Sequence, residues 1–261
     1  MCFTEYYNKL KQSKNNISYW YPKVKDCGIP SPETYIFQVP EEIVKLFAME
    51  GDTNDNHEKM MAWIKSDIIP NLPRHLQSCM FIKNGAFSNK FNFVSCATFG
   101  NVVDICHSLT DINYTSLMFD TGGLTEIAIR ERIHYDDSIT PCIYNGMPLR
   151  NEYRVFYDFY EKKPLYIVNY WDWNYCYNSI KRNLSDKIIY EHFYPYLKEH
   201  YEDNKNNIID YVHQHMQNVN DLEGIWSVDI LEDEHGKLWL IDMAEGYCSA
   251  YWDEDKAGVI K

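Results

Sequence analysis

The chain has 261 residues, of which 45% are hydrophobic and 16% aromatic, so it can bury the cores of two closely packed subdomains. Its formal net charge of -13 argues against a protein that binds the nucleic-acid backbone, since such affinity depends on Lys and Arg that neutralise phosphates. We therefore expect no nucleic-acid partner.

The eight cysteines include no CxxC pair, and the N-terminus lacks the charged and apolar stretches of a signal peptide. This pattern is typical of reduced thiols in a cytoplasmic protein. No apolar run approaches the roughly 20 residues that a membrane-spanning helix needs, so we expect no membrane partner.

The N-terminal third predicts helices that cover a sheet. Residues 1–24 are polar and aromatic and are interpreted as a helix followed by a docking segment. Prolines in residues 27–34 predict a rigid turn, and residues 35–39 a strand. Residues 40–49 and 57–69 carry apolar side chains at helical spacing.

A short apolar strand at residues 79–83 ends in Lys83, and a loop of small residues leads from it to Lys90 and a second predicted strand at residues 91–95. Such a loop suits a polyphosphate, because its backbone can approach closely and two ammonium groups supply positive charge. The sequence has no Walker motif, and a plain hairpin with exposed lysines explains the pattern equally well.

Two further strands carry arginines, at residues 127–133 and 150–159, and a return strand is predicted at residues 165–171. In the second of these, alternation puts four side chains on one face: Glu152, Arg154, Phe156 and Asp158. An arginine in the middle of a strand lies either on a solvated face or as a fixed cation aimed at an anion. Apolar spacings of three and four then predict two helices, at residues 185–199 and 206–219, with Ser185 and Asn206 as N-caps.

Residues 225–231 and 237–243 predict a β-hairpin with two opposed carboxylates. If the loop is the four residues 234–237, Leu231 lies opposite Leu240 and Asp229 opposite Asp242, and alternation places Leu240 and Asp242 on the same side of their strand. Like charges placed opposite each other destabilise a sheet, and Mg²⁺ would offset the repulsion because it prefers oxygen ligands. In the alternative register one aspartate points to solvent and the hairpin is an ordinary amphipathic one.

The order of these segments resembles the ATP-grasp superfamily over roughly residues 25–252. The resemblance is to the clade named for one arginine and two lysines, and to eukaryotic ATP-grasp proteins that chaperone assembly of a translation initiation factor. The segments that carry it are Gly28-Ile29-Pro30-Ser31-Pro32-Glu33-Thr34, Phe81-Ile82-Lys83, Ile129-Arg130-Glu131, Glu152-Tyr153-Arg154-Val155-Phe156, Val228-Asp229-Ile230 and Trp239-Leu240-Ile241-Asp242-Met243-Ala244-Glu245.

The resemblance implies an α+β fold of the ATP-grasp kind, in which two α+β subdomains with antiparallel sheets clamp a nucleotide. On this basis we expect a docking segment at residues 1–24, an N-terminal subdomain at 25–125 and a C-terminal subdomain at 126–261. The last would contain a helical insertion at about residues 172–221. The aromatic segment 170–221 is the expected surface for substrate recognition.

The resemblance also implies a set of site residues. The nucleotide contacts it predicts come from Lys83, Lys90, Arg130, Glu131, Arg132, Ile133 and Arg154. Of these, Lys83, Lys90 and Arg154 would neutralise charge on the phosphoryl oxygens during catalysis. Asp229 and Asp242 match the positions that hold Mg²⁺. The usual asparagine two positions after the last acid is Ala244 here, so either Glu245 replaces it through a shifted backbone or a second metal is absent.

The function implied is that of an ATP- and Mg²⁺-dependent ligase that joins a carboxylate to an amine or similar nucleophile through an acyl-phosphate. The alternative is an ATP-binding assembly chaperone or scaffold without ligase chemistry. It is favoured by the acidic charge and by the short stretch of about 25 residues before the first matching turn. The expected partners are ATP and either unknown carboxylate and amine substrates or a protein acceptor.

Overall fold

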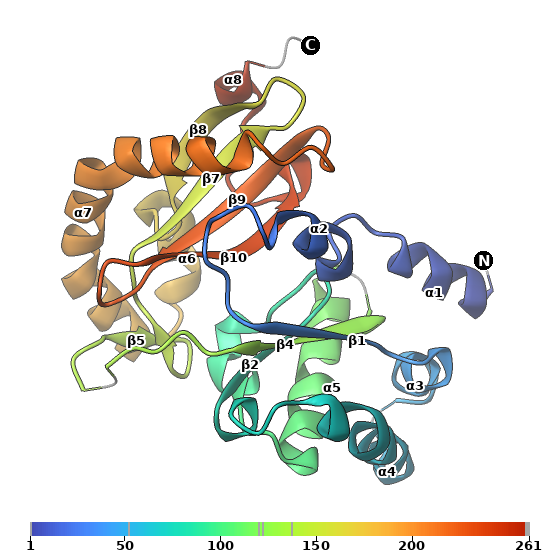
Figure 1. The fold of residues 1–261 in the computed structure, drawn as a ribbon. Coiled ribbons are helices and arrows are strands. Elements are labelled where there is room, and N and C mark those ends of the chain that lie inside the picture. Colours follow the sequence, from blue (N-terminus) through green and yellow to red (C-terminus); the bar gives the residue numbers. More distant parts are fainter. Residues whose placement is uncertain (1, 52, 120, 122, 137, 259–261) are drawn as a thin grey trace. The chain divides into compact units, whose positions relative to one another are not determined.

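Two four-stranded antiparallel sheets organise the protein in a computed structural model, which describes residues 2–51, 53–119, 121, 123–136 and 138–258 (Figure 1). Each sheet belongs to one of two units. Unit 1 consists of Met1–Tyr19, Glu33–Arg132 and Tyr144–Met147, and unit 2 of Trp20–Pro32, Ile133–Ile143 and Pro148–Lys261. The expected α+β class with antiparallel sheets is thus confirmed.

The sheet of unit 1 has the strand order β1-β4-β2-β3, and every pair in it is antiparallel. Its strands are β1 (Thr34–Gln38), β2 (Met80–Asn84), β3 (Ala97–Thr98) and β4 (Glu126–Glu131). Strand β4 is central and is buried at every position except Glu131. The strands predicted at residues 35–39 and 79–83 are confirmed.

Helices α3 (Glu41–Lys45), α4 (Asn54–Trp63) and α5 (Val102–Met118) gather on one side of this sheet (Figure 1). They enclose a core that includes Ile43, Met60, Ile64, Ile105, Leu109 and Ile129. Helices α3 and α4 continue into π-helical turns, η1 (Leu46–Glu50) and η2 (Ile64–Ile68). The two helices predicted here are therefore confirmed, while the pattern gave no sign of α5.

The second strand predicted near the lysine loop, at residues 91–95, is wrong. The chain there forms the 3-10 helix η5 (Lys90–Ser95), which buries Phe93 and leaves Val94 exposed. The amide of Cys96 donates to the carbonyl of Phe93, and Cys96 is also buried. A buried spacing of three suits a 3-10 turn, and a run of five residues is too short to distinguish it from a strand.

The sheet of unit 2 has the order β10-β9-β7-β8 and is also antiparallel throughout. Its strands are β7 (Glu152–Asp158), β8 (Lys163–Asn169), β9 (Ile225–Glu232) and β10 (Leu238–Glu245). The short helix α6 (Trp173–Ile180) precedes the long helix α7 (Leu184–Met216). Helix α7 packs on β7 and β8, where Tyr201 donates to the carbonyl of Ile167 at 3.0 Å and stacks on Tyr153.

Helix α7 corrects the prediction of two helices, because it continues through residues 200–205 without a break. Neither Gly nor Pro occurs in that stretch, so nothing in its chemistry ends a helix. The N-cap is Asn183, whose side chain accepts the amides of Ser185 and Asp186, and Asn206 lies inside the helix. A polar stretch without Gly or Pro does not by itself end a helix.

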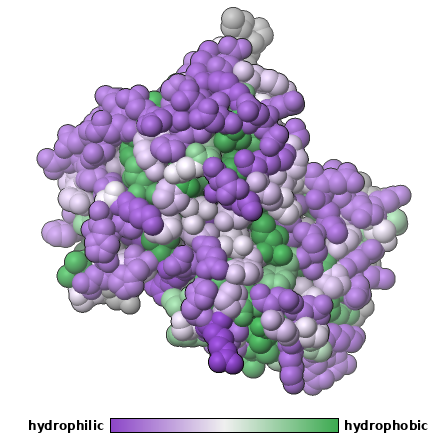
Figure 2. All heavy atoms as spheres, viewed as in Figure 1, coloured by the Kyte–Doolittle hydropathy of each residue, from purple (hydrophilic) through white to green (hydrophobic). Residues whose placement is uncertain are grey.

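The remaining elements are short. They comprise α1 (Phe3–Lys11), α2 (Ile17–Val24), η3 (Ile69–Asn71), η4 (Leu76–Ser78), β5 (Cys142–Ile143), β6 (Met147–Pro148), η6 (Gly246–Cys248) and α8 (Glu254–Ala257). Within the described part of the chain, no helix combines the length and the apolar character needed to cross a bilayer. Hydrophilic residues dominate the face drawn in Figure 2, as the charged composition leads one to expect.

Candidate functional site

Asp229 and Asp242 face each other across β9 and β10, so the predicted pairing is confirmed. The loop length and the register that produce this pairing differ from the prediction. The loop has five residues, 233–237, and Leu231 pairs with Trp239 instead of Leu240. A β-bulge between Leu240 and Asp242 then restores the register.

The bulge changes which side chains of β10 share a face. Leu240 pairs with Ile230 and Asp242 with Asp229, and neighbouring residues on β9 point to opposite faces. Leu240 is therefore on the helix-covered face with buried Ile230, and Asp242 is on the other face with Asp229. The expectation that Leu240 and Asp242 share one side is wrong, because the extra residue in the bulge reverses the alternation.

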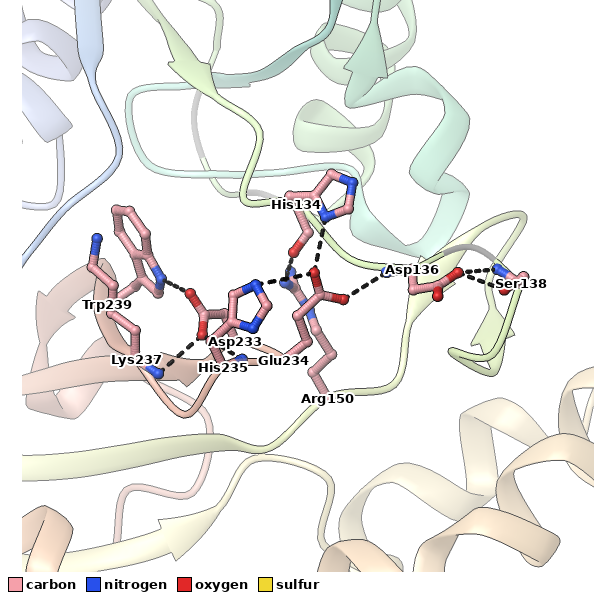
Figure 3. Close-up of polar contacts among 9 residues, drawn as sticks. All are labelled: His134, Asp136, Ser138, Arg150, Asp233, Glu234, His235, Lys237 and Trp239. Carbon is pink, nitrogen blue, oxygen red and sulfur yellow. Dashed lines mark hydrogen bonds and ion pairs between the residues drawn. The ribbon is translucent and has the colours of Figure 1, made fainter.

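The hairpin loop is closed by the side chain of Asp233 (Figure 3). One carboxylate oxygen accepts the backbone amides of His235 and Lys237, each at 2.9 Å, and the other accepts the indole N–H of Trp239 at 2.8 Å. Gly236 has a φ of +76°, which favours glycine. These bonds hold the five-residue loop on which the register depends.

Glu234 connects the same loop to the segment at residues 134–136 (Figure 3). It accepts the backbone amide of Asp136 at 2.9 Å, and its other oxygen lies 3.1 Å from Nδ1 of His134. The guanidinium of Arg150 donates to the carbonyl of His134 at 3.3 Å. The tip of the hairpin is therefore held from outside the sheet as well as from within the loop.

Arg154, on the neighbouring strand β7, pairs with Asp229 in register and binds its carboxylate with two parallel hydrogen bonds. Nε donates to Oδ1 and a terminal nitrogen donates to Oδ2, both at 2.7 Å. The second terminal nitrogen donates to the carbonyl of Ala250 at 3.1 Å, and the guanidinium lies over the ring of Tyr170. All three guanidinium nitrogens are thus held by the protein.

The pair is deeply buried: the side chains of Arg154 and Asp229 are 11% and 5% exposed. Burial by itself would lower the pKa of Arg154, but the charge and hydrogen bonds of Asp229 raise it more, and Glu152 and Asp242 add to the rise. Arg154 is therefore a permanent cation, and the Asp242 carboxylate lies within its electrostatic reach.

The carboxylates of Asp229 and Asp242 suit Mg²⁺, which one or two carboxylates plus phosphate oxygens usually hold. Glu245 is placed differently. It pairs with Trp226, so alternation puts it on the face opposite to Asp242, and it accepts the hydroxyl of Tyr247 at 2.9 Å. Across the described residues, no cluster of three or more His, Cys, Asp or Glu side chains could hold a metal. An ion at this pair would therefore take its remaining ligands from phosphate and water.

In unit 1 the two predicted lysines lie near one thiol. Lys83, on β2, is only 2% exposed, which excludes the hairpin with exposed lysines as the explanation for it. Burial raises the pKa of the Cys96 thiol to about 12, and the positive charges of Lys83 and Lys90 oppose that rise. Both ammonium groups are therefore close enough to Cys96 to act on it.

The loop between these lysines has a defined shape. The side chain of Asn84 accepts the backbone amides of Ala86 and Phe87, at 3.0 and 2.6 Å. Gly85 lies so close to its surroundings that a Cβ there would come within 2.6 Å of side-chain oxygens of Asn16 and Glu126. Packing therefore requires a glycine at position 85.

The predicted nucleotide-contacting strand is β4 and its continuation. Arg130 is 3% exposed and donates to the hydroxyl of Thr34 at 3.0 Å, while Glu131 is exposed. Arg132 donates to the sulfur of Cys79 at 3.5 Å and lies over the ring of Phe93. The chain passes from unit 1 to unit 2 between Arg132 and Ile133.

The predicted residues are thus divided between the units: Lys83, Lys90, Arg130, Glu131 and Arg132 belong to unit 1, and Ile133, Arg154, Asp229, Asp242 and Glu245 to unit 2. Sequence reasoning missed two groups that hold Arg154, namely the ring of Tyr170 and the carbonyl of Ala250. A backbone carbonyl leaves no signal in the residue type, and Tyr170 lies 16 positions after Arg154 without any periodic relation to it.

Two α+β units, each with an antiparallel four-stranded sheet, are the architecture that the sequence resemblance predicted. The sequence matches no protein-family model and no curated protein. Among solved structures, C-terminally truncated Cdc123 from Schizosaccharomyces pombe is similar with a TM-score of 0.52 and 13% identity, over 97% of this chain and 92% of that one.

Another structure of Cdc123 from the same organism gives a TM-score of 0.52 at 15% identity, over 96% of this chain and 92% of that one. A RimK domain ATP-grasp protein from Sphaerobacter thermophilus is a weaker match, with a TM-score of 0.34 and 10% identity over 88% of this chain and 57% of that one. At these identities the likeness to Cdc123 concerns the fold alone.

Proposed function

We propose that the protein binds ATP together with Mg²⁺, and that Asp229 and Asp242 hold the metal. The observation that carries this proposal is their direct pairing across β9 and β10 beside the buried cation Arg154. Two opposed carboxylates repel each other, and a divalent cation turns this repulsion into coordination. Glu245, which was expected to replace the usual asparagine ligand, is not part of this proposal, because it lies on the opposite face from Asp242.

The phosphates are proposed to take positive charge from Lys83 and Lys90. Both act on the space around Cys96, and Ala86 in the loop between them is exposed. Ammonium groups act as point charges that suit phosphate oxygens without demanding a fixed geometry. Arg130, Glu131, Arg132 and Ile133 are proposed to line the nucleotide along β4 and its continuation.

Arg154 is proposed to act on the phosphates chiefly through Asp229. Its two bonds to the carboxylate fix the plane of Asp229, and therefore the direction in which free lone pairs of the acid point. Its charge also lowers the electrostatic cost of holding two acids side by side. Orientation of a metal ligand by a buried partner is a common way to tune a metal site.

For the reaction we propose ligation of a carboxylate to an amine. The carboxylate would attack the γ-phosphate of ATP, and the bond to ADP would break. The amine would then attack the acyl carbon of the resulting acyl-phosphate, so that the C–N bond forms, inorganic phosphate leaves and the amine gives up a proton. When bound, Mg²⁺ would neutralise charge on the phosphoryl oxygens. Lys83 and Lys90 would share that task, and no Ser, Cys or His nucleophile is needed.

Calorimetric titration of ATP and Mg²⁺ into the protein tests the binding proposal. Wild type is expected to bind, and Asp242→Asn to lose Mg²⁺-dependent binding while remaining folded. Asp210→Asn, which removes an exposed acid of helix α7, is the matched control and should bind as wild type. A folded wild type that takes up no nucleotide would end the proposal.

The second candidate is an ATP-binding assembly factor without ligase chemistry. The observation in its favour is that all three nitrogens of Arg154 are already bonded within the protein, so none is offered to an acyl-phosphate. Product analysis separates the candidates. Release of ADP and phosphate that depends on an added amine and carboxylate favours the ligase, and capture of a folded partner only with ATP favours the assembly factor.

A further inference from the structure

A cavity of about 320 Å³ lies in unit 2 where helix α7 passes the ends of strands β7 and β9. Its walls come from α7, the residues just before β7, the loop between β9 and β10, and the segment at residues 135–141. None of the residues proposed to hold the metal or the phosphates lines it. Ligand sites span about 300–1,000 Å³, so this cavity suits a single ring better than a whole nucleotide.

One wall of the cavity is an aromatic stripe on α7, within the segment 170–221 that was expected to be a recognition surface. Phe193, Tyr196 and His200 are spaced by three and four residues and so share one face of the helix. The ring centroids of Phe193 and Tyr196 lie 5.0 Å apart, and those of Tyr196 and His200 lie 6.0 Å apart. Other walls include the buried side chains of Leu149 and Tyr135. A flat apolar ring can pack against such a surface.

Asn151 and Glu232 lie side by side at the sheet end of the cavity. The backbone amide of Glu232 donates to the carbonyl of Asn151 at 2.9 Å, next to the paired residues Glu152 and Leu231. Asn151 and Glu232 are therefore directly opposed and point to the same face. Within the described part of the chain, the side-chain amide of Asn151 makes no hydrogen bond. Its Oδ1 is buried, so Nδ2 is the end that a ligand can reach.

Glu232 uses only one of its two carboxylate oxygens among the residues that the structure describes. Oε2 accepts the hydroxyl of Tyr153 at 3.1 Å and lies 2.7 Å from Nε2 of His200. Oε1 faces the hairpin loop, where a Cβ built on the cavity-lining Gly236 would lie 3.9 Å from it. The cavity therefore offers one hydrogen-bond acceptor, Oε1 of Glu232, beside one donor, Nδ2 of Asn151.

The other charged side chains of the lining are bonded within the protein (Figure 3). Asp233 closes the hairpin loop, and Glu234 holds the segment at residues 134–136. Arg150 donates to a carbonyl of that segment, and its guanidinium lies 5.4 Å from the ring centroid of Tyr135. The donor and the acceptor described above are thus the groups that a ligand would have to satisfy.

We propose that this cavity binds a tyrosine side chain of another polypeptide. A phenol hydroxyl is both a donor and an acceptor, so it can donate to Oε1 of Glu232 and accept from Nδ2 of Asn151 at the same time. Its ring would pack against the aromatic stripe of α7. The inference goes beyond nucleotide binding and does not depend on it, because no residue of the proposed metal or phosphate site lines the cavity.

The rim of the cavity favours a polypeptide over a free phenol. Ile139 and Tyr196 are 77% and 51% exposed there. A second hollow shares Tyr135, Ile139 and Glu234 with the cavity, so the two are continuous. A lone ring would leave this apolar rim uncovered, whereas the residues on either side of a tyrosine in a chain would lie over it.

Ligand-detected NMR titration without nucleotide tests the inference with three compounds. They are the blocked tripeptide acetyl-Ala-Tyr-Ala-amide, the same tripeptide with Phe in place of Tyr, and p-cresol as a free phenol. We expect the tyrosine peptide to bind about tenfold more tightly than the phenylalanine peptide, because only the former satisfies both polar groups. It should also bind more tightly than p-cresol. Equal binding of the two peptides, binding of p-cresol at least as tight as that of the tyrosine peptide, or no binding of the tyrosine peptide would each overturn the inference.

Variants of the lining locate the binding. Asn151→Ala removes the donor without breaking a side-chain hydrogen bond of the described protein, and it should reduce the preference for tyrosine over phenylalanine to about threefold or less. Phe193→Ala removes part of the aromatic stripe and should weaken both peptides. Ile188→Ala is the matched control, because Ile188 is an exposed apolar residue of α7 outside the lining, and it should change neither peptide. An unchanged preference in folded Asn151→Ala, or equal weakening by Phe193→Ala and Ile188→Ala, would contradict the proposed site.

Discussion

Arg154 donates hydrogen bonds to both carboxylate oxygens of Asp229 at 2.7 Å, and the two residues are directly paired on the neighbouring strands β7 and β9. The position of this cation explains how two aspartates can face each other in a buried part of a sheet. It also separates two roles for Arg154, as a phosphate contact and as the group that orients a metal ligand. The first prediction addresses the bond itself.

Replacing Arg154 by Met should destabilise the protein by about 3–5 kcal/mol, because Asp229 would remain buried without its counter-charge. The free energy of unfolding in urea measures this. Lys187→Met, which removes a partly exposed partner of Glu191, is the control and should cost less than about 1 kcal/mol. Equal effects of the two changes would show that the buried pair has no special importance.

Changing Asp242 to Asn should leave the stability of the metal-free protein unchanged or raise it by about 0.2–1 kcal/mol, because a repulsion across the strands is removed. Urea unfolding in EDTA gives the value. A loss of more than 1 kcal/mol would mean that Asp242 has a structural task, and that a loss of nucleotide binding in this variant reflects damage to the fold.

Gly85→Ala should destabilise the protein by about 1–3 kcal/mol, since its Cβ would come within 2.6 Å of oxygens on Asn16 and Glu126. Gly123→Ala is the control, because the nearest atom to its Cβ is Leu10 Cδ1 at 3.4 Å. Thermal unfolding compares the two. If both variants unfold at the wild-type temperature, the loop after β2 is looser than the described contacts imply.

Stability should fall as the pH rises above about 9, partly because of Cys96. Its pKa is raised from the ordinary 9.0 to about 12 in the folded protein, so between these values the unfolded chain loses a proton that the folded one keeps. The contribution is fully present below pH 9 and is lost towards pH 12. Cys96→Ala should flatten the decline measured by urea unfolding, and the exposed Cys2→Ala should not. A decline of the same slope in all three proteins would contradict the buried thiol.

The pairing of Asp229 with Asp242 could be predicted from alternation, but for an incomplete reason. The real loop is one residue longer than expected, and the bulge after Leu240 adds one residue to β10, so the two differences cancel. No residue type between Leu240 and Asp242 signals a bulge. The alternation pattern could predict that Asp229 pairs with Asp242, but it could not predict on which face of the sheet Leu240 lies.

Other features depend on contacts between distant segments, which periodicity does not report. The burial of Lys83 and its closeness to Cys96 arise from the packing of β2 against neighbouring segments. Helix α7 continues through a polar stretch in which Tyr201 packs on β7 and β8, and local composition says little about such a continuation. The order of the helices and strands was largely predictable from the sequence. Their boundaries and the contacts of their side chains depend on the three-dimensional fold.

The most direct measurement is a crystal structure of the protein with a nonhydrolysable ATP analogue and Mn²⁺ in place of Mg²⁺. The anomalous signal locates the metal without assumptions about the ligand. Our account predicts one Mn²⁺ bound to carboxylate oxygens of both Asp229 and Asp242, with Lys83 on the phosphates. A bound nucleotide whose metal lies away from these two acids would contradict it.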